Sequence, residues 1–72
     1  MDRNLEDVLA RYDENTRIWV FDEHNYSYYE GELKEIYLWG NYDYIWDSLV
    51  LDWYTTSTGE VWITIDRNAK CR

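Results

Sequence analysis

The 72-residue sequence contains no proline, three glycines, one cysteine and one histidine. A single cysteine excludes an intramolecular disulfide, and with one histidine no structural zinc spacing is present. No apolar run approaches the length of a transmembrane helix. Chains this small bury only about 60% of the surface that their unfolded form exposes, and they are usually reinforced by disulfides, metals or association. We therefore expect one small domain, residues 1–72, stabilised by aromatic packing or by association.

Basic residues are also scarce. Seven lysines and arginines stand against 15 aspartates and glutamates, for a formal net charge of −8. All of the excess acidity lies in residues 1–47. Such a surface repels nucleic acid and anionic membranes, so we expect neither as a direct partner. The first residues lack the apolar core of a signal peptide and the lone thiol suits a reducing compartment, so we expect a cytoplasmic location.

Two apolar runs around the turn at residues 57–59 predict a hairpin over residues 49–65. A three-residue loop with Gly59 at positive φ places Thr56 opposite Glu60. This register creates the pairs Tyr54–Trp62, Trp53–Ile63 and Leu51–Ile65. One face then holds Leu51, Trp53, Val61, Ile63 and Ile65, and the other holds Val50, Asp52, Tyr54, Trp62 and Thr64. A longer loop would mix the two faces, so we favour this register.

A short amphipathic helix is expected at the start of the chain. Asn4 suits the N-cap, and Glu6 and Asp7 place negative charge in the first turn. The helix ends, in this interpretation, at residues 13–15. Its apolar stripe follows helical spacing and consists of Leu5, Val8, Leu9 and Tyr12.

Residues 16–21 and 26–33 predict a first hairpin. Asn25 suits the left-handed conformation in the turn between them. Taking residues 23–25 as the loop pairs Val20 with Tyr28 and Trp19 with Tyr29. One face then carries Ile18, Val20 and Tyr28, and the other carries Trp19, Phe21 and Tyr29. Because both faces are apolar, one can cover the helix and the other needs a second cover or a partner.

Residues 33–46 leave helix and strand open. Leu33, Ile36 and Tyr37 fit a short helix that stops at Gly40 and Asn41, whereas alternating aromatic residues also suit a strand. Residues 41–47 are interpreted as a loop or helical turn, and residues 67–72 as a frayed basic tail. The sequence thus predicts an α+β fold, with the N-terminal helix packed on a four-stranded, mainly antiparallel sheet made of two hairpins. A short helix or loop lies between the hairpins.

No residues form a recognisable active site. His24 stands beside Asp22 and Glu23, but a lone histidine in an acidic turn is typical of a solvated residue rather than of a metal or acid–base site. Cys71 is interpreted as an incidental thiol. No serine has a histidine at a suggestive spacing, and no glycine loop could cradle a phosphate. We predict that the protein is not an enzyme and uses no cofactor or metal.

One set of core and turn positions runs through most of the chain. It consists of Leu5, Val8, Leu9, Tyr12, Asp13, Thr16, Ile18, Val20 and Asp22, then Tyr29-Glu30-Gly31, then Val61, Ile63 and Ile65. This pattern resembles small acidic proteins encoded by phages and mobile elements of Gram-positive bacteria. Some short acidic phage proteins inhibit bacterial defence, among them anti-CRISPR and anti-restriction proteins. The resemblance implies an inhibitor in the host cytoplasm and assigns no functional residue.

Aromatic residues exceed what the predicted core can hold. Tryptophan and tyrosine commonly anchor protein interfaces, although they can also cover a small core. Stacking platforms for single-stranded nucleic acid need an electropositive groove, which this acidic chain does not suggest. The surplus residues are Trp19, Phe21, Tyr29, Trp39, Tyr42, Tyr44, Trp46, Tyr54 and Trp62.

These observations predict a non-enzymatic inhibitor that occupies a basic, nucleic-acid-binding surface of a host defence protein, such as a CRISPR effector. Carboxylates would stand in for phosphates, and aromatic side chains would be the anchors. The predicted partner-binding residues are Glu30, Glu32, Glu35, Tyr42, Asp43, Tyr44, Trp46 and Asp47. The alternative is a homo-oligomeric structural or accessory phage protein, for example a homodimer that associates through its exposed aromatic face.

Overall fold

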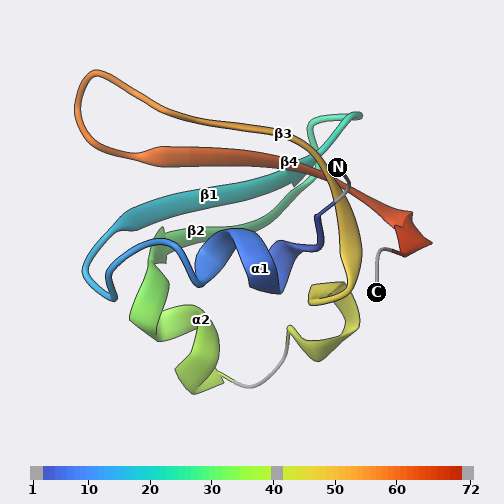
Figure 1. Ribbon diagram of the computed structural model, residues 1–72, viewed down its shortest axis with the longest axis horizontal. Helices are drawn as coiled ribbons and strands as arrows, with labels where there is room; N and C mark the ends of the chain where they lie inside the picture. Colours follow the sequence, from blue (N-terminus) through green and yellow to red (C-terminus); the bar gives the residue numbers. More distant parts are fainter. Residues whose placement is uncertain (1–2, 40–41, 71–72) are drawn as a thin grey trace.

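The computed structural model describes residues 3–39 and 42–70 and has an α+β fold with a four-stranded mixed sheet (Figure 1). The elements are α1 (Leu5–Leu9), β1 (Arg17–Asp22), β2 (Ser27–Glu32), α2 (Leu33–Trp39), the 3-10 turn η1 (Asp43–Ile45), β3 (Ser48–Thr55) and β4 (Val61–Lys70). The strand order is β2-β1-β4-β3. Both hairpins are antiparallel, and β1 and β4 join them as a parallel pair. The expected fold class is confirmed.

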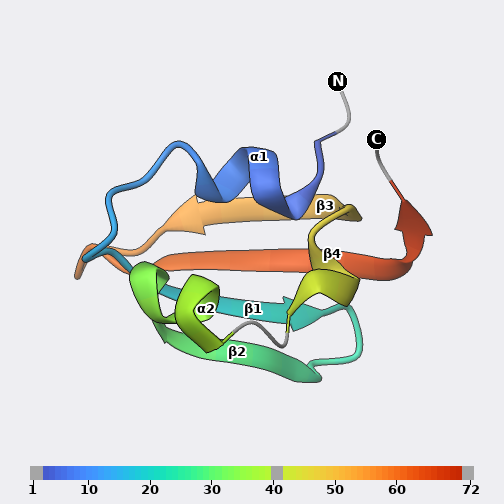
Figure 2. The same ribbon diagram turned by 90° about the horizontal axis from the view of Figure 1, so that it is seen from below.

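Both helices lie on the same side of the sheet, with α1 near β3 and α2 near β2 (Figures 1 and 2). The core fills the space between this helical layer and the sheet. Each fully buried aliphatic side chain contributes about 1.5–3 kcal/mol. The buried core residues are Leu5, Val8, Leu9, Ile18, Val20, Tyr29, Leu33, Ile36, Ile45, Val50, Val61, Ile63 and Ile65. No described element covers the opposite face of the sheet.

Helix α1 begins where the sequence predicts and ends earlier than predicted. The Asn4 side chain accepts a hydrogen bond from the Asp7 N–H at 2.8 Å, which confirms the N-cap. The helix stops at Leu9 rather than at residues 13–15. In that later stretch the Asp13 carboxylate accepts the Asn15 N–H at 2.9 Å, and such local bonds compete with helical ones. A five-residue helix is too short to be stable alone, so packing of its buried stripe holds it.

The second hairpin matches the expected register only near its turn. The Thr56 N–H donates to the Glu60 carbonyl at 2.8 Å, and Gly59 has φ 88°. The pairs Tyr54–Trp62 and Trp53–Ile63 are confirmed.

The expected Leu51–Ile65 pair is wrong. The register shifts between Val50 and Asp52, so Ile65 faces Val50. Because a bulge adds one residue to one strand, it reverses the alternation beyond it. Val50 therefore lies in the core at 8% exposure, whereas Leu51, expected there, is 45% exposed.

A second bulge changes the first hairpin. The three-residue loop is as expected, because the Asp22 N–H donates to the Tyr26 carbonyl at 3.0 Å and Asn25 has φ 65°. The predicted pairs of Val20 with Tyr28 and Trp19 with Tyr29 are wrong. Tyr28 is the extra residue, and the observed pairs are Phe21–Ser27, Val20–Tyr29 and Trp19–Glu30.

The bulge moves Tyr29 from the face of Trp19 to the core, where it is 7% exposed. Its hydroxyl donates to the Glu32 carbonyl at 2.6 Å, so the buried phenol is paired. Burial, with the nearby Glu35 carboxylate, raises the pKa of Tyr29.

Residues 33–39 form a helix rather than a strand, with Leu33 and Ile36 buried. The Leu33 and Lys34 N–H groups donate to the carbonyls of Thr16 and Glu14, both at 2.9 Å, which ties the start of α2 to the segment before β1. The expected stop at Gly40 and Asn41 lies outside the described residues. The turn η1 agrees with the helical turn expected in this region.

The C-terminal segment differs from expectation. Residues 67–70 belong to β4, and Ser48 pairs with Lys70. The predicted frayed tail is therefore wrong for residues 67–70, which continue the strand. The reason is that the backbone at the start of β3 pairs with the end of β4. Residues 71–72, including Cys71, lie outside the described part of the chain.

Candidate functional site

The uncovered face of the sheet carries four aromatic side chains in mutual contact. Ring centroids lie 5.0 Å apart for Trp19 and Phe21, 5.1 Å for Trp19 and Trp62, and 5.8 Å for Trp62 and Tyr54. These separations fall in the range where aromatic rings attract one another. We call Trp19, Phe21, Tyr54 and Trp62 the aromatic row.

Sheet topology creates the aromatic row. Trp62 on β4 faces Trp19 across the parallel pair and Tyr54 across the antiparallel pair. The row therefore crosses β1, β4 and β3. Its members alternate with buried residues such as Ile18 and Ile63, so their side chains leave the sheet on the side away from the helices.

The aromatic row is open to solvent in the described structure. Tyr54 is 49% exposed, and the two tryptophans and Phe21 are half-buried. The Trp19 indole N–H donates to the Ser27 hydroxyl at 2.9 Å, so its polar atom is satisfied on the same face. Contiguous aromatic surface that is partly exposed on an uncovered sheet face is typical of interaction sites in soluble proteins.

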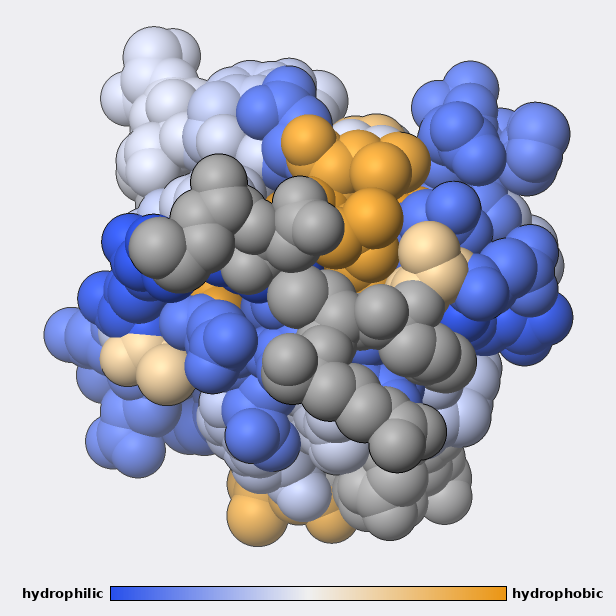
Figure 3. All heavy atoms as spheres, turned by 45° about the vertical axis from the view of Figure 1, so that its right-hand side comes forward, coloured by the Kyte–Doolittle hydropathy of each residue, from blue (hydrophilic) through white to orange (hydrophobic). Residues whose placement is uncertain are grey.

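Acidic side chains border the row. Glu30 lies opposite Trp19 on β2, and Asp52 lies opposite Thr64 on β3, both exposed. Arg17 Nε is 4.0 Å from Glu60 Oε2 in an exposed ion pair, which contributes about 0–1 kcal/mol. Figure 3 shows a compact hydrophobic patch among mostly hydrophilic residues, with a smaller hydrophobic area at the lower edge of the view.

The acids predicted from the sequence lie along β2 and the start of α2. Glu30 is on the open face beside the aromatic row. Glu32 Oε2 is 3.6 Å from Lys34 Nζ, and Glu35 is exposed in the first turn of α2. Only Glu30 of these three therefore directly neighbours a member of the row across a strand pair.

The aromatic residues predicted from the sequence lie on the helical side. Tyr42 and Trp46 are half-buried and pack against the core. Tyr42, Tyr44 and Trp46 each contact a different aromatic ring. The ring centroids lie 5.4 Å apart for Tyr42 and Tyr29, 6.4 Å for Tyr44 and Tyr28, and 5.3 Å for Trp46 stacked on Tyr37.

The remaining two predicted residues are Asp43 and Asp47. Asp43 begins η1, and its side chain lies outside the described part, whereas Asp47 is half-buried. The eight residues are therefore not brought together on one surface. The sequence predicts Trp19, Phe21, Tyr54 and Trp62 as surplus aromatic residues, but the contact between the two hairpins depends on the parallel pairing of β1 with β4.

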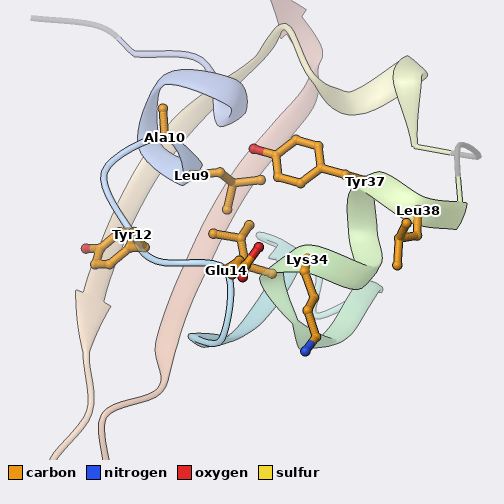
Figure 4. A pocket seen from close by; sticks show the side chains of 8 residues that line it. Leu9, Ala10, Tyr12, Glu14, Lys34, Tyr37 and Leu38 are labelled. Carbon is orange, nitrogen blue, oxygen red and sulfur yellow. The ribbon is translucent and has the colours of Figure 1, made fainter.

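A groove between α1 and α2 is the other candidate on the helical side (Figure 4). It has a volume of about 470 Å³. Its polar groups are the side chains of Glu14, Lys34, Tyr12 and Tyr37, and burial raises the pKa of Tyr37. Its apolar lining consists of Leu9, Ala10, Leu33 and Leu38.

Within residues 3–39 and 42–70, no group of three or more histidine, cysteine, aspartate or glutamate side chains could hold a metal ion. No helix of the described chain is long and apolar enough to cross a membrane. Comparisons with protein-family models, curated proteins and solved structures found no match. The aromatic row and its acidic border are the main candidate site because they combine aromatic rings in mutual contact with exposed carboxylates.

Proposed function

We propose that this chain is a non-enzymatic inhibitor that docks the open face of its sheet on a basic surface of a partner protein. That surface is one that otherwise holds nucleic acid. The observation that carries the proposal is the partly exposed aromatic row on the open face of a strongly acidic chain. A bacterial defence protein such as a CRISPR effector is the concrete partner class, in keeping with the resemblance to small acidic phage proteins.

Size supports the open face as the contact. A stable interface commonly buries about 800 Å² on each partner. A molecule of 28 × 26 × 23 Å must commit one whole face to such a contact. The open face offers a central group of large aromatic side chains, the residue types that dominate binding energy at interfaces.

Charge supports a basic partner. The net charge of −8 would attract and steer a basic protein, and the effect would weaken with added salt. Glu30 and Asp52 place carboxylates beside the aromatic anchors. These acids would contact the groups that normally bind phosphates.

The decisive experiment measures binding to a panel of nucleic-acid-binding host proteins at two salt concentrations. The variant Glu30→Lys with Asp52→Lys should slow association and abolish inhibition. The control is Glu14→Lys with Glu35→Lys, which changes net charge equally on the helical side. Absence of any binding protein in the panel would refute the proposal, and so would a larger effect of the control pair than of the open-face pair.

The second candidate function is self-association as a structural or accessory protein. The same uncovered aromatic row favours it, because two copies could bury this face against each other. Sedimentation of the purified chain over a range of concentrations separates the two functions. A stable dimer that Tyr54→Lys converts to monomer would favour self-association over the inhibitor.

A further inference from the structure

Three tyrosines surround a pocket that is separate from the aromatic row. Its volume is about 330 Å³, and we call it the tyrosine pocket. Tyr26 and Tyr28 meet edge to face at 4.9 Å, and Tyr28 meets Tyr44 at 6.4 Å. The lining residues are Asp22, Tyr26, Tyr28, Tyr44 and Arg67.

Asp22 gives the pocket a fixed negative charge. Its Oδ1 accepts the N–H groups of Tyr26 at 2.9 Å and His24 at 2.8 Å, and its Oδ2 accepts the Tyr28 hydroxyl at 3.3 Å. The hydrogen bond from Tyr26 is the main reason that the pKa of Asp22 lies below its ordinary value. A carboxylate has about four acceptor positions, so these three bonds leave capacity for one more donor.

The chain's own arginine already approaches this pocket. The Arg67 guanidinium carbon lies 6.0 Å from the centroid of the Tyr44 ring. This distance is at the outer limit of a cation–π contact, which is about 6 Å. Arg67 is exposed and forms part of the pocket wall. The pocket volume therefore lies beside the Arg67 side chain and is not filled by it.

We propose that the tyrosine pocket receives an arginine side chain of the basic partner, between the tyrosine rings and the Asp22 carboxylate. The arginine belongs to a segment of that partner that extends from the open face past Asp22, at the end of β1, to the helical side. The inference rests on the proposed function for the source of that arginine. A planar guanidinium stacks on aromatic rings and donates to carboxylates more readily than a lysine ammonium does. Arg67 acts as a weak competitor at the edge of the pocket.

The test uses arginine blocked at both ends as the probe and blocked citrulline, its uncharged analogue, as the matched control. Binding is followed by amide shifts in NMR spectra of the full chain. Arginine should shift the signals of residues 22–28 and 66–68 in a saturable way, with millimolar affinity. Citrulline should bind at least about tenfold more weakly, as expected when a cation–π contact and an ion pair are lost.

Variants separate the pocket from general attraction to an acidic protein. Arg67→Ala should bind arginine several-fold more tightly, and misfolding could not cause this gain. Arg17→Ala removes the same charge far from the pocket and should leave affinity within about twofold, because exposed charges are screened over roughly 10 Å. Tyr44→Phe should retain binding, and Tyr44→Leu should lose it.

Equal binding of blocked lysine, equal binding of citrulline, or unchanged affinity in Arg67→Ala would each overturn the arginine pocket. If a partner binds through the open face but blocked arginine does not bind, the pocket is wrong and the inhibitor proposal stands. If arginine binds the pocket while no panel protein binds the chain, the pocket is confirmed as an arginine site, whereas the inhibitor proposal and the partner as the source of the arginine are wrong.

Discussion

Trp19 and Trp62 lie edge to face across the parallel strands β1 and β4, with ring centroids 5.1 Å apart and an angle of 81° between the rings. This pair links the two hairpins on the face that the helices leave open. Because Trp62 also contacts Tyr54 on β3, one aromatic surface extends over three strands. The same pairing that completes the sheet therefore builds the candidate docking surface.

Replacing Tyr54 with alanine tests the aromatic row as an anchor. The side chain is 49% exposed, so we expect little change in the free energy of unfolding. Loss of a binding hot spot costs about 2 kcal/mol or more, which is about a 30-fold faster dissociation from the partner. Surface plasmon resonance measures this rate. Leu38→Ala, at a 79% exposed position on α2, is the control and should leave the rate unchanged.

Val50 and Leu51 test the bulge in β3. Val50 is buried and Leu51 is exposed, so Val50→Ala should lower the free energy of unfolding by about 2 kcal/mol. Leu51→Ala should lower it by less than about 0.5 kcal/mol, as is usual for surface positions. Urea denaturation of the two variants gives both values. The opposite order would mean that the strand follows regular alternation without a bulge.

Asn4 tests the contribution of the helix cap. Asn4→Ala removes the acceptor for the Asp7 N–H and should cost about 1 kcal/mol. In a domain of this size that loss lowers the melting temperature by about 4–8 °C. Asn68→Ala, at an exposed position in β4, serves as the control for thermal unfolding. Equal melting temperatures for Asn4→Ala and the unchanged chain would show that the cap contributes nothing.

Tyr29 tests the alkaline limit of stability. Burial raises its pKa above the ordinary value of 10.0, so the native state holds the phenol proton more tightly than the unfolded state does. The resulting stability is fully present below pH 10 and is lost as pH rises through the folded-state pKa. Ionisation also removes the hydrogen bond to the Glu32 carbonyl.

The measurement for Tyr29 is urea denaturation between neutral pH and strongly alkaline pH. Tyr29→Phe should be less stable at neutral pH, because the Glu32 carbonyl loses its donor, and should lose less stability above pH 10. A variant whose alkaline loss equals that of the unchanged chain would show that Tyr29 does not set this limit. Tyr54→Phe, on the open face, is the matched control and should keep the alkaline loss unchanged.

Features set by local chemistry could be predicted from the sequence. The Asn4 cap, the left-handed Asn25 and the Gly59 turn each depend on a few neighbouring residues, and each is present in the structure. The two hairpins follow from these turns and from the apolar runs beside them. The helix that begins at Leu33 was one of two alternatives, and its buried face decided between them.

Features set by contacts distant in sequence needed the tertiary structure. No turn residue in the sequence predicts the bulges at Tyr28 and Leu51. They arise because each strand must place its apolar side chains in a small core. The candidate site depends on the same long-range contacts. Alternation along each strand identifies aromatic positions one hairpin at a time, but only the parallel pairing of β1 with β4 places Trp19 beside Trp62. The sequence alone determined the local turns and the fold class. Tertiary packing decided which aromatic side chains meet, because Trp19 and Trp62 become neighbours only when β1 pairs with β4, and because one residue inserted in a strand reverses every side chain beyond it.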